Sequence, residues 1–171
     1  MIAAAQAEGK AQTKVRRTSD REIVVTRTVA APARIVFQAW SRPELFQRWW
    51  APQSHGLSIA AFEADVRAGG SYRLEMRHPS FEQPMAFFGR YLEVVPPTRL
   101  VWTNEEAGEA GQVTTVTFEE SNNATHVTVR ELYPSKEALN EAMGSGSMDC
   151  WDEQFTQLET VIAGEEASVR S

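Results

Sequence analysis

Residues 59–132 consist of short runs in which apolar and polar residues alternate, separated by segments rich in glycine, proline or asparagine. This pattern is typical of antiparallel strands that bury one face and expose the other. With an earlier run of β-branched residues, it predicts about seven strands in one sheet. Because the apolar face of such a sheet must be covered, the chain needs a second large apolar surface. The predicted strands are residues 21–31, 58–66, 69–78, 85–95, 98–105, 112–120 and 124–132.

The C-terminal segment provides that surface. Its large apolar residues follow one another at spacings of three, four, three and four residues, which is the stripe of a long amphipathic helix. Gly164 is the predicted end of this helix. Two shorter helices are predicted at 32–40 and 41–50. We therefore expect an α+β fold in which a curved antiparallel sheet wraps around the C-terminal helix. The stripe consists of Met148, Trp151, Phe155, Leu158 and Ile162.

Composition indicates a single globular domain. Of the 171 residues, 42% are hydrophobic and 23% are charged, which is ordinary for a chain that buries a core. We place the domain at residues 21–164, between an aperiodic N-terminal tail at 1–20, expected to be flexible, and a C-terminal tail at 165–171. The net charge of −6 lacks the basic surplus that phosphate-backbone binding requires, so nucleic acid is not an expected partner.

The single cysteine, Cys150, excludes an intrachain disulfide and a cysteine-based zinc site, and it fits a reducing compartment. No run approaches the roughly 20 apolar residues of a membrane span, so we expect no membrane insertion. The N-terminal residues lack the basic start and apolar middle of a secretory signal. We therefore expect a cytoplasmic protein.

Trp49 and Trp50 stand side by side before a proline-containing loop. Neighbours on a helix point about 100° apart, so the two rings cannot share one face. One ring can belong to the core, and the other needs a second surface. We hypothesise that Trp50 closes the open end between sheet and helix as a lid; the alternative is that both rings are structural.

Five segments in a fixed order resemble the SRPBCC or START-like superfamily, which includes polyketide cyclases. Within it the chain is most similar to the branch named after a homologue of the heat-shock-protein-90 ATPase activator. The resemblance covers residues 21–164 and implies a helix-grip fold, often with an apolar cavity between sheet and helix. Cys150 departs from the pattern, because relatives often have glycine there, and its side chain would narrow that gap. The segments are residues 37–52, 62–77, 87–103, 116–129 and 147–159.

Alternation along the strand at 69–78 directs one set of apolar side chains toward the C-terminal helix. Together with the helix stripe, these side chains would form an apolar, aromatic lining suited to an apolar or aromatic small molecule. The alternative is a fully packed core, because methionine and aromatic residues at these spacings usually pack. The candidate ligand-binding residues are Trp50, Tyr72, Leu74, Met76, Trp102, Phe118, Met148, Trp151 and Phe155.

Signals for catalysis are few. The three histidines lack metal-ligand spacing and no phosphate-binding loop is present, so neither a metal nor a cofactor is expected. The best acid/base candidates are Glu131 and His78, with Tyr72 as a hydrogen-bond donor, because each can rim an apolar space that shifts its pKa. The alternative is that all three are solvated or structural. Asp65 and Arg67 are expected to form a same-face ion pair.

Three functions remain open at this point. The first is non-catalytic binding of a hydrophobic or aromatic small molecule, which needs only the lining described above. The second is an enzyme similar to polyketide cyclases or aromatases, in which a pocket folds a flexible substrate. The third is a chaperone-interacting protein of the stress response, as the resemblance implies, although the acidic composition gives it no independent support. The sequence is compatible with a homodimer.

Overall fold

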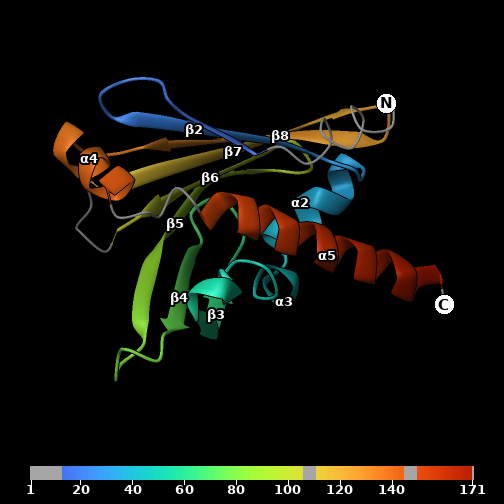
Figure 1. Cartoon of the computed structure of the whole chain (residues 1–171). Helices are drawn as coiled ribbons and strands as arrows, with labels where there is room; N and C mark the ends of the chain where they lie inside the picture. The colour runs from blue at the N-terminus through green and yellow to red at the C-terminus, as the bar shows by residue number, and fades with distance from the viewer. Residues whose placement is uncertain (1–12, 106–110, 145–149, 171) are drawn as a thin grey trace, which may run out of the picture.

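The computed structural model describes residues 13–105, 111–144 and 150–170. Their strands form one antiparallel sheet of eight strands in the order β1-β2-β8-β7-β6-β5-β4-β3. The sheet bends so that β2, β8, β7 and β6 lie above the C-terminal helix, while β5, β4 and β3 turn down beside it (Figure 1). The α+β helix-grip prediction is confirmed. The strands are β1 Lys14–Arg17, β2 Glu22–Val29, β3 Ser58–Ala64, β4 Ser71–Arg77, β5 Met85–Val95, β6 Arg99–Asn104, β7 Gln112–Ser121 and β8 Ala124–Leu132.

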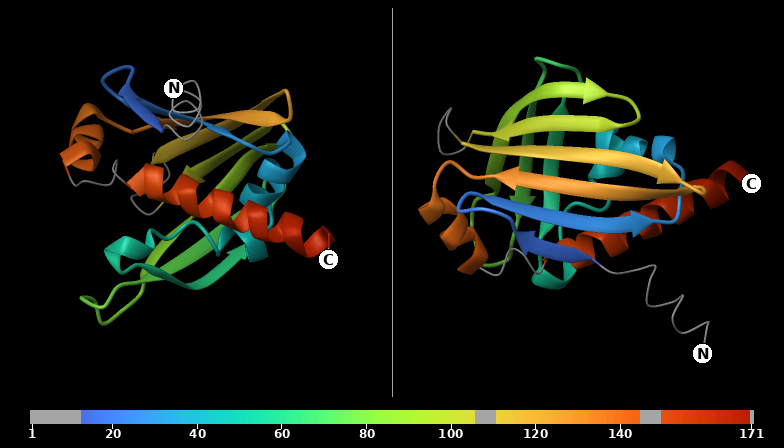
Figure 2. Two further views of the ribbon diagram at one scale, coloured as in Figure 1. Left: turned by 45° about the vertical axis from the view of Figure 1, so that its right-hand side comes forward. Right: turned by 90° about the horizontal axis from the view of Figure 1, so that it is seen from above.

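The long helix α5, Cys150–Arg170, lies in the concave side of the sheet (Figure 2). The first predicted short helix is present after β2 as α2, Ala33–Ser41. The second, predicted at 41–50, is shorter: α3 comprises Pro43–Phe46, and residues 47–50, with Trp49 and Trp50, form turns. A short 3-10 turn, η1, follows at Gln53–His55. Within the described residues, no helix has the length and apolar character needed to cross a membrane.

The core fills the space between α2, α5 and strands β2, β7 and β8. Val36 of α2, Val127 of β8 and Phe155 and Leu158 of α5 are at most 1% exposed there. The apolar stripe of α5 therefore covers the sheet, as the spacing predicted. Toward β4 and β5 the interior is not filled, and the cavity described below lies in that part.

Strand β1 corrects the prediction of about seven strands. Residues 14–17 fall in the expected N-terminal tail, yet they pair with β2 in the register Lys14↔Thr26 to Arg17↔Ile23. Three of these four residues are exposed, so the segment lacks the alternation of apolar and polar residues by which a strand is recognised in a sequence. A short, positively charged strand of this kind is a common way to end a sheet, because its charges disfavour pairing with another chain.

Helix α5 corrects the predicted C-terminal boundary. It continues past Gly164 to Arg170, so residues 165–170 are helical rather than a tail. A glycine inside a helix costs only about 1 kcal/mol relative to alanine, which is not enough to end a well-packed helix. Glu165 also pairs with Arg48 at 2.8 Å, which ties this part of the helix to the region after α3.

Helix α4, Lys136–Gly144, was not predicted from the sequence. Its one buried residue is Leu139, so it lacks the apolar stripe that identifies a surface helix. Asn140 accepts a hydrogen bond from Arg17 of β1 at 2.8 Å. The short strand and the short helix thus support each other at one end of the sheet.

Arg27 of β2 fixes α5 to the sheet. Only 3% of this residue is exposed, and its guanidinium group contacts Asp152 at 3.0 Å and Glu159 at 2.6 Å. The guanidinium carbon also lies 5.8 Å from the centre of the Phe155 ring. Position 27 was expected to be an ordinary strand residue, and its charge partners come from a helix more than a hundred residues later in the chain.

Candidate functional site

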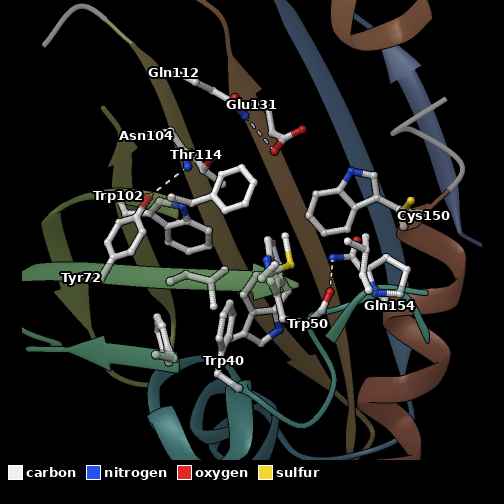
Figure 3. Close-up of a pocket in the computed structure, with 18 of the residues that line it drawn as sticks. Trp40, Trp50, Tyr72, Trp102, Asn104, Gln112, Thr114, Glu131, Cys150 and Gln154 are labelled. Atoms are coloured by element: carbon white, nitrogen blue, oxygen red, sulfur yellow. Dashed lines mark hydrogen bonds between the residues drawn. The ribbon is translucent and has the colours of Figure 1, made fainter. Parts of the chain in front are cut away.

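A partly open cavity of about 340 Å³ lies between the bent sheet and the N-terminal part of α5 (Figure 3). This volume is at the lower end of the range for small-molecule sites. The sheet wall comes mainly from β4, β5 and β6, and the helix wall from the first turns of α5. The sheet side includes Tyr72, Leu74, Met76, Phe87, Tyr91 and Trp102, and the helix side includes Cys150, Trp151 and Gln154.

Trp49 and Trp50 have different environments. Trp49 is 1% exposed, and its indole Nε1 donates a hydrogen bond to the carbonyl oxygen of Ala39 at 2.9 Å. Trp50 is half-buried and lines the cavity. Its ring stacks on Phe46 with centroids 4.8 Å apart, and Trp151 of α5 meets it edge-on at 5.9 Å. The pair therefore provides one core ring and one ring in the cavity wall.

Trp40 of α2 forms the floor between core and cavity. It is 3% exposed, and its indole N–H has no hydrogen-bond acceptor among the described residues. Its neighbours are aromatic, with the rings of Trp49 at 4.7 Å and Trp102 at 6.0 Å. An unsatisfied buried donor costs about 1–3 kcal/mol, and aromatic faces are weak acceptors that recover part of it.

Tyr72 directs its hydroxyl group toward a polar part of the lining. The hydroxyl donates to the carbonyl oxygen of Thr103 at 2.6 Å and accepts from Nδ2 of Asn104 at 3.0 Å. Gly89 of β5 allows this arrangement, because a Cβ there would lie 1.9 Å from the same Thr103 oxygen. The close approach of β5 to β6 thus requires a glycine, and the resulting geometry positions the tyrosine hydroxyl.

Glu131, near the end of β8, is the acidic residue of the lining. Its Oε2 accepts a hydrogen bond from Nε2 of Gln112 at 2.9 Å, and its Oε1 lies 3.5 Å from the hydroxyl of Tyr133. Burial raises the pKa of Glu131 to about 7. Burial, followed by the charge of Glu131, also raises the pKa of Tyr133 above its usual range. Figure 3 shows Gln112 and Glu131 at the end of the cavity away from Trp40 and Trp50.

Residues 49–54, which we call the strap, follow α3, include the first two residues of η1 and close the cavity on the side of α5. Side chains of α5 hold the strap by its backbone. Gln154 donates to one strap carbonyl oxygen at 2.7 Å, and Gln157 donates to two others at 2.7 and 2.8 Å. Glu153 accepts from the backbone N–H and the hydroxyl of Ser54 at 2.8 and 2.6 Å. These polar contacts therefore add to the aromatic packing of Trp49 and Trp50 in fixing this part of the wall.

The structure brings most of the candidate ligand-binding residues together around the cavity. Phe118 and Phe155 do not line it; they are 2% and 1% exposed and pack in the core beside α2. Met148 lies outside the described residues. The candidates that line the cavity are Trp50, Tyr72, Leu74, Met76, Trp102 and Trp151.

The three acid/base candidates do not form one group. Tyr72 and Glu131 line the cavity, but His78 follows β4 and lies outside the lining. The His78 Nδ1 accepts the backbone N–H of Ser80 at 3.0 Å, and its ring packs against Phe81. Within the described residues, no cluster of histidine, cysteine, aspartate and glutamate could hold a metal ion.

Asp65 and Arg67 form the expected ion pair, at 2.8 Å on the surface. Cys150 lines the cavity, so its side chain does occupy space between helix and sheet, as the sequence comparison implied. The predictions did not include the lining residues Asn104 and Gln112. Strand alternation could have identified Asn104, because it shares a face with Trp102.

The comparisons with known proteins agree with this fold. Residues 30–163 match the family model described as Activator of Hsp90 ATPase homolog 1-like protein. A solved structure from Nitrosomonas europaea is 23% identical over 88% of this chain and 99% of its own, with a TM-score of 0.79. One from Rhodobacter sphaeroides is 18% identical over 90% and 99%, with a TM-score of 0.81. One from Staphylococcus epidermidis is 25% identical over 89% and 94%, with a TM-score of 0.75. The comparison with curated proteins gave no match.

Proposed function

The chain belongs to the family of Activator of Hsp90 ATPase homolog 1-like proteins, with the helix-grip fold of the SRPBCC superfamily, and on this premise we propose that its cavity binds an apolar or aromatic small molecule. The observation that carries the proposal is an unfilled interior space lined by aromatic side chains from the sheet, the strap and α5. A packed core of the same residues would leave no such space. Small-molecule sites typically have this volume and this kind of apolar, aromatic lining.

The arrangement of polar groups supports binding without chemistry. An acid/base enzyme needs a group that can take a proton and a second that can give one at the reacting atoms. In this cavity Glu131 already accepts hydrogen bonds from Gln112 and Tyr133, and the hydroxyl of Tyr72 is engaged by Thr103 and Asn104. His78 lies away from both.

An enzyme similar to polyketide cyclases is the second candidate. One observation favours it: burial brings the pKa of Glu131 to about 7, which is suitable for proton transfer near neutral pH. The two hydrogen-bond partners of Glu131 are poor proton donors near neutral pH, because Gln112 does not titrate and the pKa of Tyr133 is raised, so we rank this function below simple binding.

The test of binding uses the five tryptophans as reporters. Two-dimensional NMR resolves their indole N–H signals, and single Trp→Phe variants assign them. On titration with the neutral probe 2-naphthalenemethanol, we expect saturable shifts of the Trp50, Trp102 and Trp151 signals. The Trp49 signal should stay in place, because its N–H is bound to Ala39 on the core side.

A cavity-filling variant provides the control. Leu74 lines the cavity, so Leu74→Trp should abolish the saturable shifts. The matched variant Leu92→Trp places the same side chain on the outer surface, where Leu92 is 46% exposed, and should leave binding unchanged. Absence of saturable shifts in the wild type, or shifts that persist in Leu74→Trp, would refute binding in this cavity.

A further inference from the structure

The polar end of the cavity contains a carboxyl group without a cationic partner. None of the ion pairs among the described residues includes Glu131. Arg21, which approaches Tyr133, donates to its carbonyl oxygen at 3.0 Å, and Arg130 pairs with Glu22 at 3.6 Å. The described lining contains no lysine, arginine or histidine.

An ionised carboxylate in such a place is costly. Removing a charge from water is unfavourable unless an opposite charge or several hydrogen bonds compensate it. Glu131 receives one short hydrogen bond, from Gln112, and one long contact, from Tyr133. An apolar residue would fit the lining at lower cost. A positive partner from outside the described chain would compensate this carboxylate.

The rest of the lining is suited to the same partner. The faces of aromatic rings carry negative electrostatic potential and attract ammonium groups, most strongly in tryptophan. Trp50, Trp102 and Trp151 present such rings along the cavity, and the overall charge of −6 favours the approach of cations. An apolar body with a positive end would match both parts of the cavity.

We infer that the ligand is an apolar or aromatic amine, with its hydrocarbon body among the tryptophans and its protonated amino group on the Glu131 carboxylate. This inference rests on the proposed binding function and specifies the class of ligand. It also predicts a dependence on pH, because the amine needs the ionised carboxylate. Gln112 of β7 and Tyr133 bond the carboxyl group of Glu131, and Thr114 of β7 and Ile23 of β2 are its partners across the sheet; of these only Tyr133 titrates, above the working range.

Three probes that differ at one group test the inference. They are 2-naphthylmethylamine, the neutral 2-naphthalenemethanol and the anionic 2-naphthoate, measured by calorimetry at about pH 8. For the wild type we expect the amine to bind about tenfold or more tightly than the alcohol, and the anion to bind most weakly. Glu131→Gln should remove the advantage of the amine while the alcohol still binds. Glu119→Gln, which removes an exposed charge from β7, is the matched control and should behave as the wild type.

A second measurement uses the wild type alone. Because burial raises the pKa of Glu131 to about 7, the affinity for the amine should rise about tenfold between about pH 6 and pH 8. An alkyl amine stays protonated over this range, and the affinity for the alcohol should not rise with it.

The outcomes separate the two proposals. If the alcohol binds as tightly as the amine, if the preference survives in Glu131→Gln, or if the pH profile for the amine is flat, the amine inference is wrong and the binding function stands. If none of the three probes binds, both proposals fail. Loss of amine preference in Glu119→Gln as well would mean that overall charge, not Glu131, causes it, and this too would overturn the inference.

Discussion

At the scale of single residues, the ionisation of Glu131 lowers the free energy of unfolding by an amount that can be measured. Its pKa rises from 4.5 in the unfolded chain to about 7 in the folded protein. Between these values the folded state binds more protons than the unfolded state, so the free energy of unfolding falls as pH rises through this range. The stabilising contribution is complete below about pH 4.5 and lost above about pH 7.

We therefore expect Glu131→Gln to gain stability relative to the wild type as pH increases. The shift from 4.5 to about 7 predicts that the difference in unfolding free energy moves by roughly 2–3 kcal/mol in favour of the variant between about pH 5 and pH 8. Glutamine still accepts the hydrogen bond from Gln112, so the variant should fold. Urea unfolding at several pH values measures the difference, with Glu119→Gln as a reference. A difference that is constant with pH would show that Glu131 ionises normally.

The environments of Trp49 and Trp50 were predictable from the sequence only in part. Helix geometry alone predicts that Trp49 and Trp50 face different surroundings, and the structure places one in the core and the other in the cavity wall. The sequence hypothesis chose Trp50 because it adjoins the proline-containing loop, but the choice could be settled only by where α5 and the strap meet. That contact joins residues about a hundred positions apart, so local pattern carries no record of it.

At the scale of elements, Arg27 joins β2 to α5 through charged hydrogen bonds and through packing of its apolar stem. We expect Arg27→Ala to lower the unfolding free energy by about 2–4 kcal/mol, because it removes three charge-assisted hydrogen bonds, one to Asp152 and two to Glu159, and a buried side chain. Arg27→Met should lose less, since it keeps the stem. Arg48→Ala breaks another bond to α5, but both partners are about half exposed, 48% and 44%, so its cost should stay within about 1 kcal/mol. Equal effects of Arg27→Ala and Arg48→Ala in denaturant unfolding would contradict this account.

Elements with a periodic apolar pattern in their own residues were predicted from the sequence. Elements that form through contacts with distant parts of the chain were not. Strands β3 to β8 carry alternation in their own residues, and so does the inward face of Tyr72, Leu74 and Met76. Strand β1 and helix α4 have few buried residues and form against each other. Helix α5 likewise continues past Gly164, where Glu165 pairs with Arg48, more than a hundred residues earlier in the chain.

At the scale of the whole molecule, the interior has a packed half beside α2 and an open half beside β4 and β5. Phe118 and Trp102 both point inward from neighbouring strands, yet one is core and the other lines the cavity. Alternation in the sequence identifies the side chains that point inward. It does not show which of them α2 covers and which remain open to the cavity. The candidate site could therefore be predicted as a face of the sheet, and its division between core and cavity required the assembled fold.

The contacts that hold each wall of the cavity predict which wall opens to admit a ligand. The sheet and α2 are joined by apolar packing, whereas α5 holds the strap by side-chain hydrogen bonds to its backbone, and Gln157 makes three of them. Trp49 anchors the start of the strap in the core, but the part that follows it is held to α5 by bonds that cost about 1 kcal/mol each to break, so we expect this part of the wall to open most readily.

We expect Gln157→Ala to increase hydrogen exchange of the strap amides by about 5–30-fold, because losing 1–2 kcal/mol shifts local opening by that factor. Association and dissociation of the naphthalene probes should accelerate together, leaving the dissociation constant nearly unchanged, because the variant alters the route and not the lining. Thr160→Ala is the matched control: its hydroxyl bonds only within α5, to the Thr156 carbonyl oxygen, among the described contacts. Unchanged exchange at 49–54 in Gln157→Ala, or faster exchange throughout the sheet, would mean that ligands enter by another route or that the whole fold opens.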